Sequence, residues 1–359
     1  MIVQTKTEAM RYSLFAITLV LALTGCSDST NKRPKDFAVP DLPEIKAKLA
    51  FTCSHELDRI PARDPEADQL YKYARWLRKS NLTKRDPSVF PIIERLIRIS
   101  TASGHDKANL ELRELIANGE AKSLTPIAEA INLTEDLINR GVPGGYYDMG
   151  QYLERGYGVV QDHDLALKYF RKSADLGSPD GQYLVGRKLL PVDAAPDVAK
   201  AMLLCATEQG HGTAGLELGV DLKTDKQYEK SLVALQLSVK AGHYSAASFL
   251  QHGFEGPPAN DELYYLGQQK DLDRARRYEA IGKTLFDYDY LNPKVPEIDE
   301  IVPLPPAKLP PWDGKLKWLE EHKANVPPPL PSEARIAEMA KAKGLDPATG
   351  RPLAWGNTR

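Results

Sequence analysis

The 359-residue chain has only three cysteines and seven histidines, and it has no excess of charge of one sign. Its 47 basic and 49 acidic side chains are interleaved, and no basic patch stands out that would favour nucleic acid. Cys53 and His55 are close in sequence, but a metal site would need two more ligands. We therefore expect no cofactor, no metal and no nucleic-acid partner.

The motifs of common catalytic sites are also missing. No Gly-x-Ser-x-Gly segment supplies a hydrolase nucleophile. Gly156 and Gly158 follow a helical pattern rather than a strand, so they do not predict a phosphate-binding loop. Three histidines, His105, His211 and His243, directly follow a glycine, which indicates turn residues rather than catalysts. The sequence predicts a binding protein and not an enzyme.

What the chain does contain is a repeat. A glycine ends a helical pattern at intervals of 32 to 37 residues, and a small residue follows four positions later in each copy. The glycine and small-residue pairs are Gly104 and Ala108, Gly141 and Gly145, Gly177 and Gly181, Gly210 and Ala214, and Gly242 and Ala246. A period of about 20–50 residues is typical of solenoids, in which stacked helix pairs share a core. The sequence predicts an all-α protein, a right-handed α-solenoid of helix-turn-helix repeats over residues 44–285.

One copy, residues 144–177, resembles a known pattern, the Sel-one-like repeat (SLR), which is a relative of the tetratricopeptide repeat (TPR). The matching positions are Leu153, Gly156-Tyr-Gly-Val159, Asp162, Ala166, Tyr169, Phe170, Ala174 and Gly177. Near the C-terminus, residues 309–314 and 331–350 resemble the signature of one family of Sel-one-like lipoproteins. That family is similar to the immunity proteins paired with type VI secretion phospholipase or lipase effectors. The resemblance implies a cognate toxin as partner and its neutralisation as function.

The N-terminus has the features of an export signal. Arg11 precedes an apolar run over residues 12–23, which is too short to span a bilayer comfortably. The run leads into Leu23-Thr-Gly-Cys26, which resembles the bacterial lipobox, where the signal (residues 1–25) is removed and Cys26 is acylated. Ser27 follows where an Asp would resemble an inner-membrane retention signal, so the resemblance implies an outer-membrane lipoprotein facing the periplasm. The polar residues 26–43 predict a flexible tether.

The solenoid is expected to begin near Glu44, because Cys53, Leu57 and Ile60 lie on one stripe at helical spacing. Cys53 would then be a buried thiol, and Cys205 also lies in an apolar helical segment. In a solenoid each repeat touches only its neighbours. We therefore do not expect these two cysteines, 152 positions apart, to form a disulfide.

The last segment, residues 286–359, has a different composition. Eleven prolines between Pro293 and Pro331 exclude a continuous helix and favour an extended backbone. A disordered linker is one interpretation, but disordered tails are usually poor in aromatic residues. This tail holds three of the four tryptophans, Trp312, Trp318 and Trp355. We expect it to lie ordered along the solenoid and to include a short helix from Ser332 to Lys343.

A partner would bind the surface of the array. First helices of stacked pairs typically line one side of such solenoids, and their non-core positions are the candidate contacts. These are Tyr146, Tyr147, Gln151, Tyr152, Gln182, Tyr183 and Arg187. Tyrosine is a common interface anchor, although these rings could instead pack between repeats. A cell-envelope scaffold that binds proteins without inhibiting them is the alternative function.

Overall fold

The computed structural model describes residues 49–191 and 195–354, all within one compact unit, Leu42–Arg359. The predicted signal, the 26–43 tether with Cys26, and Trp355 lie outside the described residues. Regular structure in the described ranges is helical, apart from a single bridge between Leu345 and Pro352. No helix in these ranges is both long and apolar enough to cross a membrane.

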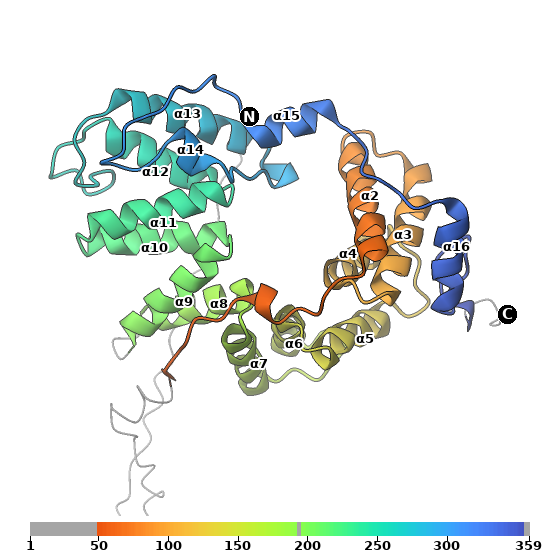
Figure 1. Ribbon diagram of the computed structural model, residues 1–359. Coiled ribbons are helices and arrows are strands. Elements are labelled where there is room, and N and C mark those ends of the chain that lie inside the picture. Colours follow the sequence, from red (N-terminus) through yellow and green to blue (C-terminus); the bar gives the residue numbers. More distant parts are fainter. Residues whose placement is uncertain (1–48, 192–194, 355–359) are drawn as a thin grey trace, which may run out of the picture. The chain divides into compact units, whose positions relative to one another are not determined.

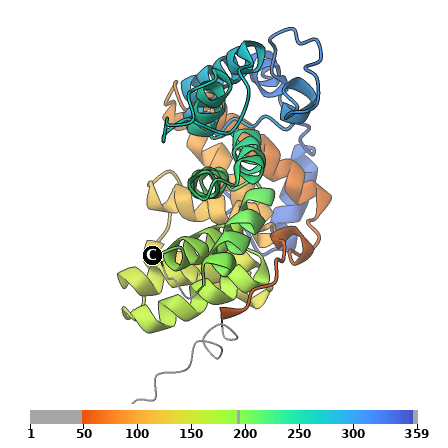
Figure 2. The same cartoon turned by 90° about the vertical axis from the view of Figure 1, so that its left-hand side faces the viewer.

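Twelve helices succeed one another from Pro65 to Asp287 (Figure 1). They are α2 (Pro65–Asn81), α3 (Phe90–Ala102), α4 (Asp106–Ala117), α5 (Pro126–Asn139), α6 (Pro143–Arg155), α7 (His163–Leu176), α8 (Pro179–Leu189), α9 (Pro196–Glu208), α10 (Gly212–Thr224), α11 (Tyr228–Lys240), α12 (Tyr244–Phe254) and α13 (Leu272–Asp287). Each packs on its neighbours in the chain, most extensively within the pairs α6–α7, α8–α9, α10–α11 and α12–α13 (Figure 2). The predicted all-α solenoid is confirmed.

The repeated glycines make the turns between helices. Gly104, Gly141, Gly177, Gly210 and Gly242 have φ between +74° and +106°, a left-handed conformation that only glycine adopts at little cost. The small residues four positions later start the next helix and face the helix before it. Ala108, Ala214 and Ala246 are fully buried. The repeat read from the sequence therefore marks positions where one helix packs closely on the helix before it.

Gly145 offers a test of this packing, with its neighbour Gly144 as a matched control. A Cβ on Gly145 would lie 2.7 Å from Leu137 Cβ and 3.0 Å from the Ile138 backbone nitrogen. On Gly144 it would meet only the end of one side chain, the Glu56 carboxylate, at 3.3 Å. Alanine favours a helix by up to ~1 kcal/mol over glycine, but overpacking costs about 1–3 kcal/mol. In urea unfolding we expect Gly145→Ala to be clearly less stable than Gly144→Ala. Equal stability of the two variants would contradict this packing.

The segment before α2, residues 49–64, is not the helix that the apolar stripe predicted. From residue 50 it is non-helical apart from one 3₁₀ turn, η1 (Glu56–Asp58), and Leu57 is 76% exposed. Pro61 and Pro65 limit any helix here to a short piece. The first helix of the array with described bounds is therefore α2, from Pro65, and the predicted start near residue 44 lies outside the described residues.

This segment, called the strap below, is held to the array by polar contacts. Arg171 of α7 donates to the carbonyls of Leu49 and Ala50, at 3.3 and 2.6 Å. Gln182 of α8 donates to the Ser54 carbonyl at 2.8 Å. Near the other end of the strap, Arg63 pairs with Asp106 at the start of α4. The strap thus runs across several repeats.

The strap also carries a disulfide that the sequence argument excluded. Cys53 and Cys205 of α9 are joined, with their Cα atoms 5.7 Å apart. The stacking rule applies to helices, and Cys53 is not on one. An extended segment can cross repeats, so it reaches a helix much later in the chain.

Glu56 of the strap gives the fold a dependence on pH. Its Oε1 accepts a hydrogen bond from the Gly144 amide at 3.1 Å, and its own amide donates to Gln209. Burial raises the pKa of Glu56 to about 7, and the nearby Asp180 carboxylate adds to the rise.

With this pKa, the folded chain binds more protons than the unfolded chain between about pH 4.5 and 7. The unfolding free energy should therefore fall as pH rises through that window, by about 2–3 kcal/mol. Glu56→Gln should remove most of this fall, leaving a smaller part from Asp148, whose pKa is also raised by burial, and the exposed control Glu135→Gln should keep the whole fall. Urea midpoints measured from pH 4.5 to 7.5 check this, and an unchanged slope in Glu56→Gln would refute it.

The C-terminal tail packs on the end of the array, as expected. It contains η3 (Asp289–Leu291), α14 (Ile298–Ile301), α15 (Lys317–Ala324) and α16 (Glu333–Ala342). Five of its side chains join the buried cluster of α11, α12 and α13: Val295, Ile298, Ile301, Val302 and Leu316. Gln236 of α11 links the two parts, because it donates to the Val302 carbonyl at 2.8 Å and accepts from the Tyr278 hydroxyl at 2.7 Å.

The last helix, α16, packs at the opposite end of the array (Figure 1). Ile336, Met339 and Ala340 share a buried cluster with side chains of α2, α3 and α4. After α16, Arg351 forms a two-pronged pair with the buried Glu94 of α3, at 2.8 and 3.0 Å. The tail therefore joins the last helices of the array to the first.

Candidate partner-binding surface

The predicted contact residues lie on two first helices. Tyr146, Tyr147, Gln151 and Tyr152 belong to α6, and Gln182, Tyr183 and Arg187 belong to α8. Five of the seven are half-buried, Arg187 is exposed and Gln182 is fully buried. The structure does not test whether a partner binds them, so their role stays a prediction.

Gln182 does not fit that role. Its Nε2 donates to the carbonyls of Ser54 and Ala174, and its Oε1 accepts from Gln209. The side chain therefore fastens the strap and cannot meet a partner without leaving those bonds. The sequence could not reveal this, because nothing near Gln182 in the chain predicts the strap.

Tyr152 belongs to a charged network between first helices α4 and α6. Arg113 of α4 is 8% exposed and donates to Asp148 at 2.6 Å, to Tyr152 Oη at 3.1 Å and to Thr134 at 3.0 Å. Burial raises the pKa of Asp148, and the guanidinium of Arg113 opposes that rise. This network fixes Tyr152, so the hydroxyl is already occupied within the chain.

A second network connects α8 to α10. The Tyr183 hydroxyl donates to Glu217 at 2.8 Å, and its ring stacks on His211 at 4.4 Å. Arg187 lies 3.4 Å from the same hydroxyl and 3.8 Å from Glu217. Along this face, charged groups and tyrosine hydroxyls are paired with each other.

Tyr146 and Tyr147 pack within their own repeat. The Tyr146 ring lies 6.1 Å from that of Tyr169, and the Tyr147 ring lies 5.8 Å from that of Phe170. Burial also raises the pKa of the Tyr147 hydroxyl. Both rings are half-buried, so they combine packing with an accessible edge.

Removing Arg113 should damage the array. Arg113→Met leaves the Asp148 carboxylate without its partner, and breaking such a pair costs about 3–5 kcal/mol. Adding Asp148→Asn should restore part of the loss, because it removes the uncompensated charge. The exposed Arg155→Met on α6 is the control. Urea unfolding compares wild type, Arg113→Met, the double variant and Arg155→Met. If Arg113→Met is as stable as Arg155→Met, the pair contributes little.

The histidines are used in turns, as predicted for His105 and His211. The Nδ1 atoms of both accept the amide of the residue three positions later, Ala108 and Ala214, each at 3.1 Å. His243 occupies the same position before α12 without making that side-chain bond. One candidate metal cluster occurs in the described ranges, Cys53, His55 and Cys205, but its sulfurs are joined in the disulfide.

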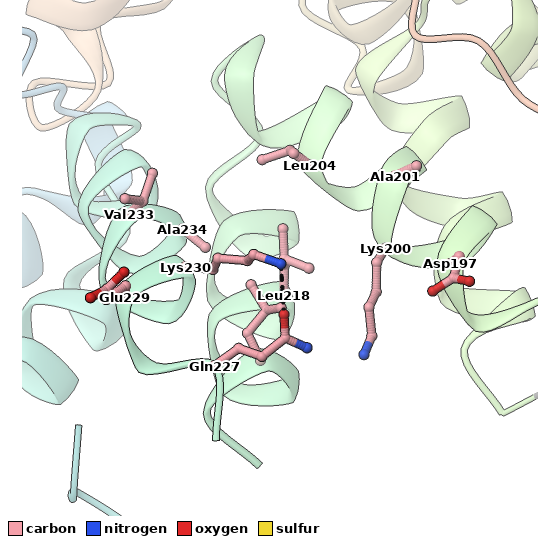
Figure 3. Close-up of a pocket in the computed structure, with 11 residues that line it drawn as sticks. Asp197, Lys200, Ala201, Leu204, Leu218, Gln227, Glu229, Lys230, Val233 and Ala234 are labelled. Atoms are coloured by element: carbon pink, nitrogen blue, oxygen red, sulfur yellow. Dashed lines mark hydrogen bonds between the residues drawn. The ribbon is translucent and has the colours of Figure 1, made fainter. Parts of the chain in front are cut away.

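A groove between α9 and α11 has a volume of about 610 Å³ (Figure 3). Leu218 of α10 lies between the two helices, and Leu204 and Val233 are 40% and 49% exposed. Lys230 and Gln227, joined at 2.8 Å, lie at its edge with Lys200. The groove offers apolar contact with a charged border.

Comparison with known proteins agrees with this architecture. The model of the Sel1 repeat matches residues 143–178, and the model described as "Domain of unknown function (DUF6396)" matches residues 246–353. The solved structure of Pseudomonas aeruginosa 5086 (PA5086) is 31% identical, covers 71% of this chain and 95% of its own, and has a TM-score of 0.53. The chain belongs to the Sel1-repeat family that includes PA5086.

Two further structures bear on this Sel1-repeat protein. Immunity protein Pa5087 from P. aeruginosa is 28% identical, over 72% of this chain and 95% of its own, with a TM-score of 0.54. Immunity protein PA5088 from P. aeruginosa is 23% identical, over 71% and 94%, with a TM-score of 0.55, and it shares the fold. No curated protein sequence matches the chain. The predicted resemblance to Sel-one-like immunity proteins is confirmed, and the type of effector is not among these findings.

Proposed function

We propose that this Sel1-repeat protein is an immunity protein that binds and neutralises a toxic lipase or phospholipase. The observation that carries the proposal is the likeness to immunity protein Pa5087, which extends over 95% of that chain. An extended array also offers a long surface for covering the mouth of an enzyme.

The proposal includes a location. The Leu23-Thr-Gly-Cys26 segment would be cleaved before Cys26, which would then carry acyl chains in the outer membrane and face the periplasm. Several acyl chains anchor more firmly than one. A lipid anchor would hold the inhibitor at the membrane, where a lipase acts.

Co-expression tests the function. The protein encoded beside this gene is directed to the periplasm of a host cell, with and without the full chain. We expect the neighbour alone to kill the cell and the full chain to restore growth. The control is a host cell that produces the neighbouring protein together with an unrelated Sel1-repeat protein. If the chain gives no protection, or the neighbour is harmless, the immunity proposal fails.

Fractionation tests the location separately. Cys26→Ser should leave an uncleaved precursor and remove the protein from the outer-membrane fraction. A Cys26→Ser chain that fractionates like wild type would rule out the lipid anchor. The scaffold alternative predicts several envelope proteins, rather than one stoichiometric toxin, bound to the purified chain.

A further inference from the structure

A second cavity, of about 530 Å³, lies between α2 and the C-terminal tail. One wall is the end of α2, and the other is formed by η3 and α15. Four aromatic rings line it, and we call it the aromatic pocket: Trp76, Tyr288, Tyr290 and Trp318. Trp and Tyr are the residue types most enriched among energetic anchors of protein interfaces.

The pocket is assembled from residues that are distant in sequence. Asn325, in the left-handed conformation with φ +45°, ends α15 and accepts hydrogen bonds from Trp76 Nε1 at 2.9 Å and Ser80 Oγ at 3.3 Å. These bonds join α2 to a residue almost 250 positions later. The pocket therefore exists only when the tail has closed on the first helix of the array.

The tail wall is held by stacked rings. Trp318 and His322 are nearly parallel, with centroids 5.3 Å apart, and Tyr288 meets Trp318 edge-on at 5.6 Å. Aromatic pairs of this kind are stabilised beyond their buried area. The wall is thus formed before any ligand arrives, which lowers the ordering cost of binding.

Several lining groups have no partner of their own. Tyr290 is 61% exposed and has no hydrogen-bond or ring partner among the described residues. Lys79 and Lys84 have no carboxylate within salt-bridge distance in the same ranges. Lys323 also lines the pocket but pairs with Glu320 at 3.3 Å, and the one acid in the lining is Glu321. Lys79 and Lys84 therefore supply the positive excess. This excess and the exposed ring fit a ligand that carries both a carboxylate and an apolar side chain.

We propose that the aromatic pocket binds an acidic segment of the partner protein, with Tyr290 as an apolar anchor and Lys84 as a charge contact. This inference rests on the proposed function, because the partner is the toxin named there. The hydroxyls of Tyr152 on α6 and Tyr183 on α8 are hydrogen-bonded within the chain, whereas Tyr290 has no partner in the part of the chain that the structure describes. Charge complementarity and the tyrosine anchor point to a protein surface.

Binding kinetics test the pocket. The probe is a catalytically inactive form of the protein encoded by the adjacent gene, and the full chain is immobilised for surface plasmon resonance. Tyr290→Ala should raise Kd about 30-fold, mainly through faster dissociation. Lys84→Glu should slow association about tenfold at low salt and much less at 0.5 M salt. Lys168→Glu, an exposed lysine of α7, is the matched control and should bind as wild type.

The outcomes separate the two proposals. If wild type binds the probe and both pocket variants match Lys168→Glu, the pocket inference fails and the immunity proposal stands. If wild type does not bind the probe, both fail. Vesicles of phosphatidylglycerol are a second probe. If Tyr290→Ala and Lys84→Glu abolish vesicle binding and leave toxin binding intact, the pocket is a membrane site and the protein-partner inference is overturned. Both substituted side chains are exposed, so unchanged circular dichroism should confirm folding.

Discussion

A chain that ends at Asn292 should lose about 10 kcal/mol of unfolding free energy and should not accumulate as a folded protein. The truncation removes five buried side chains from the cluster on α11, α12 and α13, from Val295 to Leu316. Each such side chain contributes about 1.5–3 kcal/mol by leaving water. Because the net stability of a domain is only about 5–15 kcal/mol, this loss is comparable to the whole.

Polar groups add to the effect of this truncation. Gln236 would lose the Val302 carbonyl, and the Lys240 carbonyl would lose the Val295 amide, which lies 3.0 Å away. The last repeats would then expose an apolar face. In solenoids, terminal units with a polar outer face keep such faces from water. The tail acts as that unit here.

Expression level and urea unfolding of the truncated chain check the prediction. Two single substitutions, one with a large and one with a small expected loss of stability, serve for comparison. Ile298→Ala, at a fully buried position, should cost about 2–5 kcal/mol. Leu330→Ala, at a position 36% exposed, should change stability by less than about 0.5 kcal/mol. A soluble truncated chain with a cooperative transition near that of wild type would show that the array is complete without its tail.

The parts that the sequence predicted well are those decided by local chemistry. A left-handed turn needs glycine, and a close helix crossing needs a small side chain. Gly177 and Gly181 therefore stand out in the sequence without knowledge of the partner helix. The Asp64-Pro65 start of α2 is equally local, because the Asp64 carboxylate accepts the Ala67 amide at 2.8 Å. Such local signals predicted the helices and their order along the chain.

The helix predicted for the strap was wrong, because apolar spacing alone does not distinguish a helix from an extended segment with long-range contacts. Cys53, Leu57 and Ile60 fit a helical stripe, but their neighbours form bonds to residues 88 to 153 positions away. Gln182 was misjudged for the same reason. The aromatic pocket was missed although Trp318 had marked the tail as ordered, because its wall from α2 lies 249 positions earlier at Trp76. Long-range pairings leave no periodic pattern in one sequence.

Reduction of the Cys53–Cys205 disulfide should destabilise the chain by about 4–5 kcal/mol. The bridge closes a loop with a sequence separation of 152, and the entropy removed from the unfolded chain grows with loop length, to about 4.7 kcal/mol for 100 residues. Urea midpoints with and without dithiothreitol measure the effect. The variant Cys53→Ala/Cys205→Ala should match the reduced wild type and should not respond to the reductant. Equal midpoints for oxidised and reduced wild type would contradict it.

The same experiment shows whether the bridge holds the strap in place or only shortens the unfolded chain. Glu56 lies three residues after Cys53, and its pKa of about 7 depends on burial against the array. If reduction frees the strap, Glu56 returns to water and most of the fall in stability between pH 4.5 and 7 disappears. If the strap stays bound through Gln182 and Gln209, the fall persists at a lower overall stability. We expect persistence, because the polar contacts of the strap do not pass through the sulfurs, and the disulfide then acts chiefly on the unfolded chain.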